Sequence, residues 1–71
     1  MTEAEGELGN RLKALRSDAG LTQAELAAMV GVSRKTINTV ENEVFTPSTT
    51  LALKLARALN APVETLFFLR A

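Results

Sequence analysis

The chain has 71 residues, with eight basic and eight acidic side chains and with neither cysteine nor histidine. A chain of this length forms one domain and buries only about 60% of the surface that it exposes when unfolded, so self-association is expected to add stability. The lack of cysteine and histidine excludes the disulfide and zinc sites that stabilise many small domains, and we expect no metal or other cofactor.

The distribution of hydropathy and charge along the chain predicts the location of the protein and the class of its partner. No apolar run reaches the roughly 18 residues that span a bilayer, and the acidic start lacks the pattern of a signal peptide, so we expect a cytoplasmic protein without membrane contact. Residues 1–7 contain three glutamates, which leaves a net charge of +3 on residues 8–71. We interpret residues 1–7 as a flexible acidic tail and residues 8–71 as a single domain whose clustered cations suit nucleic acid.

Apolar side chains recur at helical spacing, and there are only three Phe and no Trp or Tyr, so we predict an all-α fold of five short helices. The first helix is expected to begin near Leu8, to bury Leu8, Leu12 and Leu15, and to end at Gly20. Arg16 lies four residues after Leu12 and shares its buried face. A charge in that position requires a partner.

The next two helices follow each other closely. Residues 22–25 have the S/T-x-x-E pattern of a capping box, which predicts a helix over residues 23–30. Gly31 ends this helix, because a residue without Cβ tolerates a left-handed turn, and Ser33 is a suitable N-cap for a helix over residues 34–42. That helix has a thin apolar side and a broad polar side, so its polar face is available to a partner.

Two further helices complete the prediction. One spans residues 49–59, and its leucines and alanines form core and not a cofactor site. A short helix over residues 62–67 follows, and three large apolar residues lie in the last five positions, more than a terminus normally exposes. They can complete the monomer's own core, but we favour a dimer contact in residues 63–71. The predicted contact residues are Leu66, Phe67, Phe68 and Leu69.

The chain resembles the phage-repressor, Cro and XRE family of helix-turn-helix proteins, particularly short regulators similar to the cytolysin repressor. Two runs carry the resemblance, LTQAELAAMVGVSRKTINTVEN and PSTTLALKLARALNAPVETLF, and the likeness covers residues 8–67. It implies a five-helix, lambda-repressor-like DNA-binding domain in which the helix over residues 34–42 lies in the major groove. It also implies a structural ion pair, because family members usually pair the residues that correspond to Arg16 and Glu41.

The side chains of the helix over residues 34–42 suit DNA by their own chemistry, although an ordinary solvated helix face has a similar composition. Arginine and lysine donate to guanine, asparagine pairs with adenine, and the threonine methyl packs on thymine. The candidates for reading bases are Arg34, Lys35, Asn38 and Thr39. The candidates for contacting the DNA backbone are Gln23, Ser33, Thr36 and Asn42, and also Arg11 and Lys13 if these two are not ordinary surface charges.

The chain departs from the family where this helix ends. Members commonly read E-N-G-K there, whereas this chain has Glu41, Asn42, Glu43 and Val44. Glu43 must either adopt a left-handed conformation, which is costly for a residue with a Cβ, or end the helix differently. It also brings a carboxylate near the expected DNA backbone, so we expect modest affinity.

These observations predict a sequence-specific transcription regulator, a repressor that binds a palindromic operator in double-stranded DNA as a homodimer. The alternative is a protein-interaction module, such as an antitoxin or an antagonist, which the zero net charge and Glu43 favour. Enzymatic activity is not expected, because Asp18 is the single aspartate and no Gly-rich phosphate loop or paired carboxylate site is present. No small-molecule ligand is evident.

Overall fold

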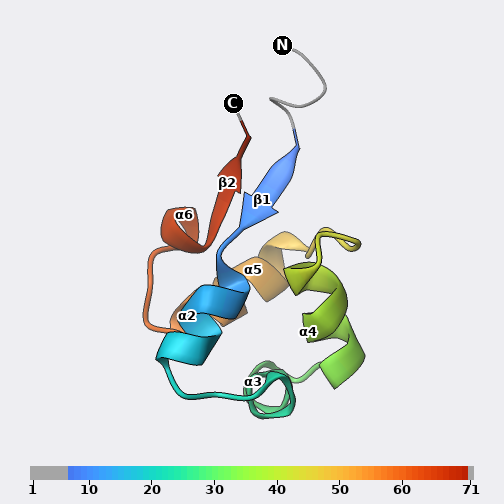
Figure 1. Ribbon diagram of the computed structural model, residues 1–71, viewed down its shortest axis with the longest axis vertical. Coiled ribbons are helices and arrows are strands. Elements are labelled where there is room, and N and C mark those ends of the chain that lie inside the picture. The colour runs from blue at the N-terminus through green and yellow to red at the C-terminus, as the bar shows by residue number, and fades with distance from the viewer. Residues whose placement is uncertain (1–6, 71) are drawn as a thin grey trace.

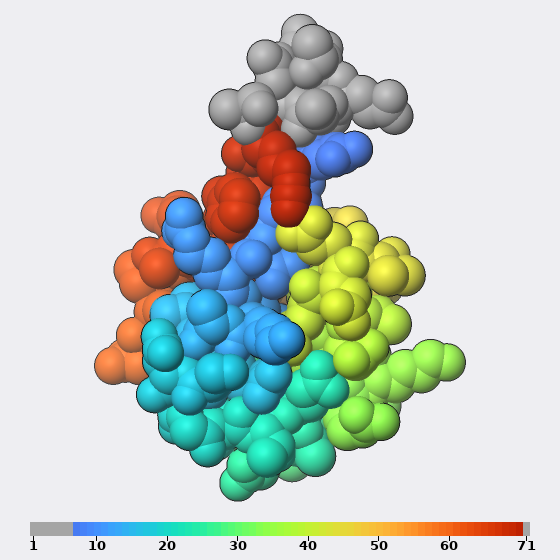
Figure 2. Space-filling model, viewed as in Figure 1, coloured from blue at the N-terminus to red at the C-terminus, as the bar shows by residue number. Residues whose placement is uncertain are grey.

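The computed structural model describes residues 7–70, and within them it contains five helices and two short strands (Figure 1). In chain order these elements are β1 (Leu8–Asn10), α2 (Leu12–Asp18), α3 (Gln23–Val30), α4 (Arg34–Glu41), α5 (Thr49–Ala58), α6 (Val63–Leu66) and β2 (Phe67–Leu69). The five predicted helices are present, but the prediction of an exclusively helical fold is corrected by the strand pair. Figure 2 shows a rounded helical body from which the strand pair extends at one end.

The predicted acidic tail lies outside the described residues, except for Glu7. The carbonyl oxygen of Glu7 accepts a hydrogen bond from the Arg70 N–H at 2.9 Å, so this residue is tied to the other end of the chain. Among residues 7–70, no helix is long and apolar enough to cross a membrane.

β1 and β2 form an antiparallel ladder that joins the two ends of the chain (Figure 1). The residues that face one another are Leu8 and Leu69, Gly9 and Phe68, and Asn10 and Phe67. The prediction that the first helix begins near Leu8 is therefore wrong. Gly9 explains the difference, because a Cβ at this position would lie 2.6 Å from Cε2 of Phe68. A larger residue at this position would force the Phe68 ring to move.

Helix α2 begins at Leu12 because Asn10 occupies the preceding turn. The Asn10 Oδ1 accepts a hydrogen bond from the Leu12 N–H at 3.1 Å, and its Nδ2 donates to the Val40 carbonyl oxygen at 2.9 Å. Asn10 therefore joins the start of α2 to the last turn of α4. Gly20, at φ +73°, turns the chain after α2 as predicted.

Helices α3 and α4 begin on the predicted signals, and α3 also ends on one. Thr22 Oγ1 accepts from the Glu25 N–H at 3.0 Å and Glu25 Oε1 accepts from the Thr22 N–H at 2.9 Å, so the capping box is confirmed. Gly31 ends α3 in the left-handed conformation, at φ +76°. At the start of α4, Ser33 Oγ accepts from the Thr36 N–H at 3.1 Å.

The core is built from all five helices of the described chain. The largest fully buried side chains are Leu12, Leu26, Ile37, Val40, Leu55 and Leu66. Helix α5 starts on Ser48, whose Oγ accepts from the Leu51 N–H at 3.1 Å, and Asn60 at φ +52° turns the chain towards α6. Helix α6 is shorter than predicted, because the chain from Phe67 onward pairs with β1 instead.

Two of the four residues predicted to form the dimer contact are buried inside the monomer. Leu66 and Phe67 belong to the hydrophobic core, so for them the alternative that the sequence left open is the correct one. Phe68 is half-buried and Leu69 is exposed. Of the four residues, only Phe68 and Leu69 therefore retain surface for a second copy of the chain.

Candidate nucleic-acid interface

Helix α4 presents a polar face to solvent. Arg34 and Lys35 are exposed at its N-terminal end, and Asn38 and Thr39 are half-exposed one turn later. The opposite side of the helix is anchored in the core by fully buried apolar residues, among them Ile37. The four base-reading candidates therefore lie on the free part of α4, as a helix that enters a groove requires.

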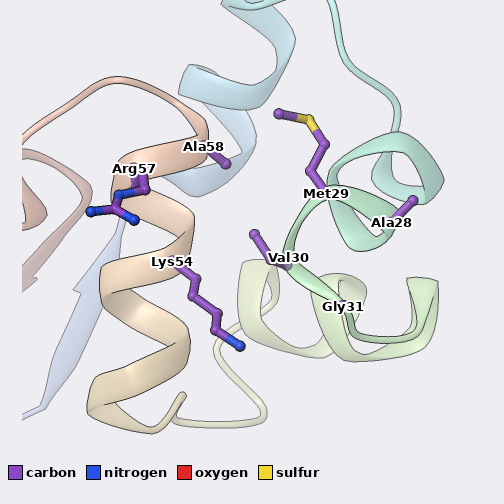
Figure 3. Close-up of a pocket in the computed structure, with 7 residues that line it drawn as sticks. All are labelled: Ala28, Met29, Val30, Gly31, Lys54, Arg57 and Ala58. Atoms are coloured by element: carbon purple, nitrogen blue, oxygen red, sulfur yellow. The ribbon is translucent and has the colours of Figure 1, made fainter.

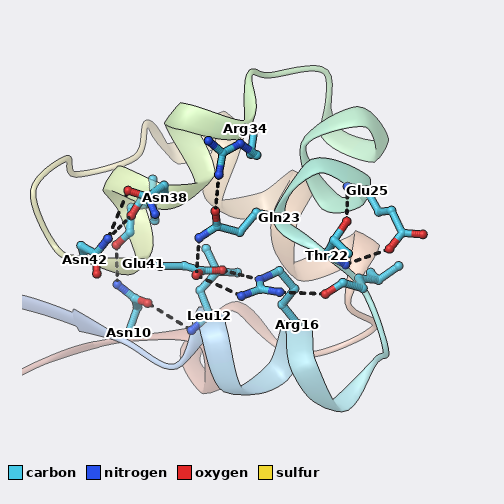
Figure 4. Close-up of polar contacts among 12 residues, drawn as sticks. Asn10, Leu12, Arg16, Thr22, Gln23, Glu25, Arg34, Asn38, Glu41 and Asn42 are labelled. Carbon is cyan, nitrogen blue, oxygen red and sulfur yellow. Dashed lines mark hydrogen bonds and ion pairs between the residues drawn. The ribbon is translucent and has the colours of Figure 1, made fainter.

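The ion pair that the family resemblance implies is present and holds the far end of α4 (Figure 4). Arg16 Nε donates to Glu41 Oε2 at 2.6 Å, and Nη2 donates to Oε1 at 3.3 Å. The third nitrogen, Nη1, donates to the Leu21 carbonyl oxygen at 2.8 Å. The hydrogen bond to Glu41 raises the pKa of Arg16, although burial acts in the opposite direction. Two of the three bonds therefore join α2 to α4, and the third holds the turn after α2.

Gln23 extends this ion pair into a chain of side chains that reaches the start of α4. Its Nε2 donates to Glu41 Oε1 at 3.0 Å, and its Oε1 accepts from Arg34 Nη1 at 3.4 Å. Figure 4 shows Gln23 lying between the two partners. An amide nitrogen has two N–H groups, so Gln23 keeps one donor for a phosphate oxygen. Sequence reasoning predicted the phosphate contact for Gln23, but not its second task of positioning Arg34.

Asn42, whose phosphate contact stays a prediction, also binds a base-reading candidate. Its Nδ2 donates to the Asn38 carbonyl oxygen at 3.0 Å and to Asn38 Oδ1 at 3.2 Å (Figure 4). An amide oxygen has two lone pairs, so Asn38 can keep this bond and still pair with an adenine edge through Oδ1 and Nδ2. Asn42 therefore fixes the orientation of the Asn38 amide.

The hydroxyl groups of α4 are partly used within the helix. Ser33 Oγ and Thr36 Oγ1 lie 3.0 Å apart and share one hydrogen bond, which leaves one hydroxyl hydrogen of the two for a phosphate. Thr39 Oγ1 donates to the Thr36 carbonyl oxygen at 2.9 Å. A partner can therefore contact the methyl group of Thr39 or donate a hydrogen bond to its Oγ1.

The two remaining candidates for contacting the DNA backbone lie on or beside α2. The Arg11 guanidinium lies 5.0 Å from the centroid of the Phe68 ring, a cation–π contact with the C-terminal strand. Lys13 is exposed on α2. Arg11 thus has a packing role at the strand pair, while a phosphate contact by either residue stays a prediction.

Arg70 is a residue that sequence reasoning missed. Glu43 adopts the left-handed conformation at φ +61°, the first of the two possibilities that the sequence left open. Arg70 Nη2 donates to its Oε1 at 2.6 Å and to its Oε2 at 2.5 Å. The pair neutralises the carboxylate that was expected to repel DNA. The two residues are 27 positions apart, and only the path of β2 brings them together.

A separate hollow lies between the end of α3 and α5 (Figure 3). Its lining combines an exposed methionine and small residues with two cations; the lining residues are Ala28, Met29, Val30, Gly31, Lys54, Arg57 and Ala58. Side-chain hydrogen-bonding groups are limited to Lys54 and Arg57. The hollow thus suits an apolar contact better than the reading of base edges.

The fold and the polar face of α4 define a helix-turn-helix regulator of transcription. A family model described as helix-turn-helix matches residues 12–66. An uncharacterised HTH-type transcriptional regulator from Archaeoglobus fulgidus is 47% identical over 57 residues, which cover 80% of this chain and 81% of the relative. The chain therefore belongs to the helix-turn-helix family of transcriptional regulators, and the resemblance to the XRE type is confirmed.

Solved structures agree with this assignment. The restriction-modification controller protein C.AhdI from Aeromonas hydrophila is similar with a TM-score of 0.74 at 36% identity, covering 78% of this chain and 83% of the controller. The P22 c2 repressor, solved in complex with a synthetic operator, has a TM-score of 0.74 at 33% identity and covers 89% of this chain and 91% of its own. Both likenesses extend over most of the chain.

Proposed function

We propose that the protein is a repressor that binds a palindromic operator in double-stranded DNA as a homodimer. The polar face of α4 is the observation that carries this proposal. It offers two cations and one amide, the side-chain types that read guanine and adenine in the major groove. The relative solved on its synthetic operator makes the same use of the scaffold a reasonable expectation.

The surroundings of α4 favour contact with phosphates. The first N–H groups of α3 have no partner within the helix, and a helix N-terminus attracts anions. Gln23 stands at that N-terminus with one amide N–H left for a phosphate oxygen. Because Arg70 neutralises Glu43, the end of α4 is less repulsive to DNA than its sequence indicates.

The side chains that the C-terminal segment leaves exposed support the proposed dimer. Phe68 and Leu69 lie on β2 next to the chain ends, away from α3 (Figure 1). A twofold dimer through this segment would present two copies of α4 to consecutive major grooves about 34 Å apart. Replacing Leu69 with glutamate is expected to shift the protein from dimer to monomer in sedimentation, and an unchanged dimer would refute this contact.

The main test is selection of operators by the full chain from a random duplex library. We expect enrichment of a palindrome with half-sites one helical turn apart, and an affinity that falls steeply with salt. Failure to enrich any duplex refutes the proposal. In that case the alternative of an antitoxin or antagonist gains weight, with the hollow between α3 and α5 as its apolar contact surface and with little salt dependence.

Single variants then separate base reading from backbone contact. Arg34→Ala should cost about 1–3 kcal/mol of binding and relax the preference at one base pair, whereas Gln23→Ala should weaken all sequences alike. Arg57→Ala is the matched control, since it removes an exposed arginine on α5 and should leave the selected sequence unchanged. Identical sequence profiles for the first two variants would contradict the assignment.

A further inference from the structure

The hollow between α3 and α5 carries cations without acids. Lys54 and Arg57 lie three positions apart on α5, so they share one side of the helix, and both are exposed. Both also line a second hollow, whose other lining residues are Thr50 and Leu53. No aspartate or glutamate lines either hollow, and within residues 7–70 neither cation forms an ion pair. The two positive charges are thus available to a partner.

Two large apolar side chains stand beside these cations. Met29 is 56% exposed near the end of α3, and Leu53 is 55% exposed on α5. In Figure 3, Met29 extends from α3 towards α5, and Lys54 extends from α5 towards α3. Together the two hollows form a single surface, the α3–α5 groove, because they share Lys54 and Arg57. The groove combines apolar contact area with positive charge.

This combination suits a protein helix better than DNA. Phosphates attract Lys54 and Arg57 but offer no apolar group to Met29 and Leu53. An amphipathic helix offers both, since apolar side chains recur along one face and carboxylates can flank them at a spacing of three or four residues. The groove also lies at the C-terminal end of α3, whereas Gln23, which is proposed to contact phosphate, stands at the N-terminal end.

We propose that the α3–α5 groove binds an acidic amphipathic helix of another protein. Apolar side chains of that helix contact Met29 and Leu53, and its carboxylates pair with Lys54 and Arg57. The inference goes beyond the proposed function, because no part of it requires α4 to bind DNA. It gives the chain a second binding surface, made of residues that the base-reading face does not use.

Selection from a library of helical peptides tests this proposal. Each peptide carries leucines at helical spacing along one face and random residues elsewhere, and the full chain is the bait. We expect the enriched peptides to have glutamate or aspartate next to the leucines. A selection that enriches basic or uncharged peptides, or none at all, overturns the proposal.

Variants of the chain then locate the site of an enriched peptide. Lys54→Ala combined with Arg57→Ala should weaken binding about tenfold, the factor expected for the loss of two exposed ion pairs. Leu53→Ala should weaken binding by about the same factor through lost apolar contact. The matched control is Ala14→Glu combined with Ser17→Glu, which lowers the net charge by the same amount at exposed positions of α2 and should keep the parent affinity.

Three results would assign the peptide to another cause and overturn the proposal. If replacing Arg34 and Lys35 removes binding while replacing Lys54 and Arg57 does not, the peptide binds α4. If the double variant of α5 weakens binding to duplexes of random sequence as strongly as it weakens peptide binding, the groove is a nucleic-acid surface. If the control loses as much affinity as the double variant, net charge alone attracts the peptide. Melting temperatures equal to that of the parent chain show that all variants are folded, and failure to select an operator would leave this inference standing.

Discussion

Two arginine–glutamate pairs hold the C-terminal end of α4, and they differ in burial. The side chains of Arg16 and Glu41 are 12% and 3% exposed, whereas those of Arg70 and Glu43 are both 36% exposed. Both pairs have short N–O distances. Short distances alone therefore do not determine how much an ion pair contributes to stability. A buried charge depends on its partner, whereas an exposed charge can exchange its partner for water.

The hydrogen bonds around the two pairs support the same distinction. The inner pair has further hydrogen bonds to the Leu21 carbonyl oxygen and to Gln23, so it joins α2, α3 and α4. The outer pair joins one turn to the C-terminal strand. We therefore expect the inner pair to be required for the fold and the outer pair to adjust local charge.

The largest expected effect is that of Arg16→Ala. It leaves the Glu41 carboxylate buried without a cation, which should lower the free energy of unfolding by about 3 kcal/mol, the low end for buried pairs because Arg16 retains some solvent contact. Urea denaturation followed by circular dichroism measures this. Replacing both partners together, as Arg16→Met with Glu41→Leu, should recover most of the loss, and an unchanged unfolding curve for Arg16→Ala would contradict the expectation.

A smaller effect, with the opposite sign, is expected for Glu43→Gly. Glycine removes the left-handed cost of about 1–2 kcal/mol but gives up the exposed pair and adds freedom to the unfolded chain, so the net stabilisation should be below about 1 kcal/mol. Operator affinity should rise, because the loss of the carboxylate releases the Arg70 cation, which then adds a positive charge near the phosphates. Glu43→Gln is the matched control, since it removes the charge and keeps the strain. A Glu43→Gly protein that melts well below the parent would contradict this account.

Arg70→Ala tests the outer pair from its other side. The loss of stability should be at most about 1 kcal/mol and should shrink as salt screens the exposed charges. Thermal unfolding at low and high salt gives the comparison. A loss as large as that of Arg16→Ala would remove the distinction between the two pairs.

The smallest effect concerns a carboxylate held by hydrogen bonds alone. The bonds from the Thr22 backbone N–H and the Thr22 side chain lower the pKa of Glu25. Because the pKa is lower in the folded state than in the unfolded state, the contribution of Glu25 is present at neutral pH and is lost as the pH falls through the lowered value. Melting temperatures between pH 7 and pH 3 should therefore fall less steeply for Glu25→Gln, and parallel curves for the two proteins would argue against the capping role.

Local signals were sufficient to predict much of the fold. The capping box at Thr22 and Glu25 and the turn at Gly31 were predictable because each depends on residues within four positions. The strand pair was not, because Gly9 and Phe68 are far apart in the sequence and Gly9 in isolation has no strand preference. Helix propensity and spacing therefore extended the first helix too far towards the N-terminus.

In the candidate site, too, features set by nearby residues were predictable and those set by distant residues were not. The polar face of α4 follows from helical periodicity, so its residues were named correctly as exposed or half-exposed. The tasks of Gln23, Asn42 and Arg70 depend on side chains from other turns or elements, which periodicity does not specify. Helical spacing also predicts that Val44 shares the buried side of α4 with Ile37 and Val40. That prediction is wrong, because α4 ends at Glu41 and Val44 is 78% exposed in the turn after it.

The side-chain relay from Arg16 through Glu41 and Gln23 to Arg34 has a consequence for how operator preference can change during evolution. Its inner members are bound to the fold, and its last member is exposed and held by a single bond of 3.4 Å. Arg34 can therefore be replaced by another side chain at little cost in stability, and the replacement can change the preferred operator sequence. The inner members meanwhile keep α4 in the same orientation relative to the rest of the fold. Among such regulators, sequence differences should then be more frequent at the position of Arg34 than at the inner members.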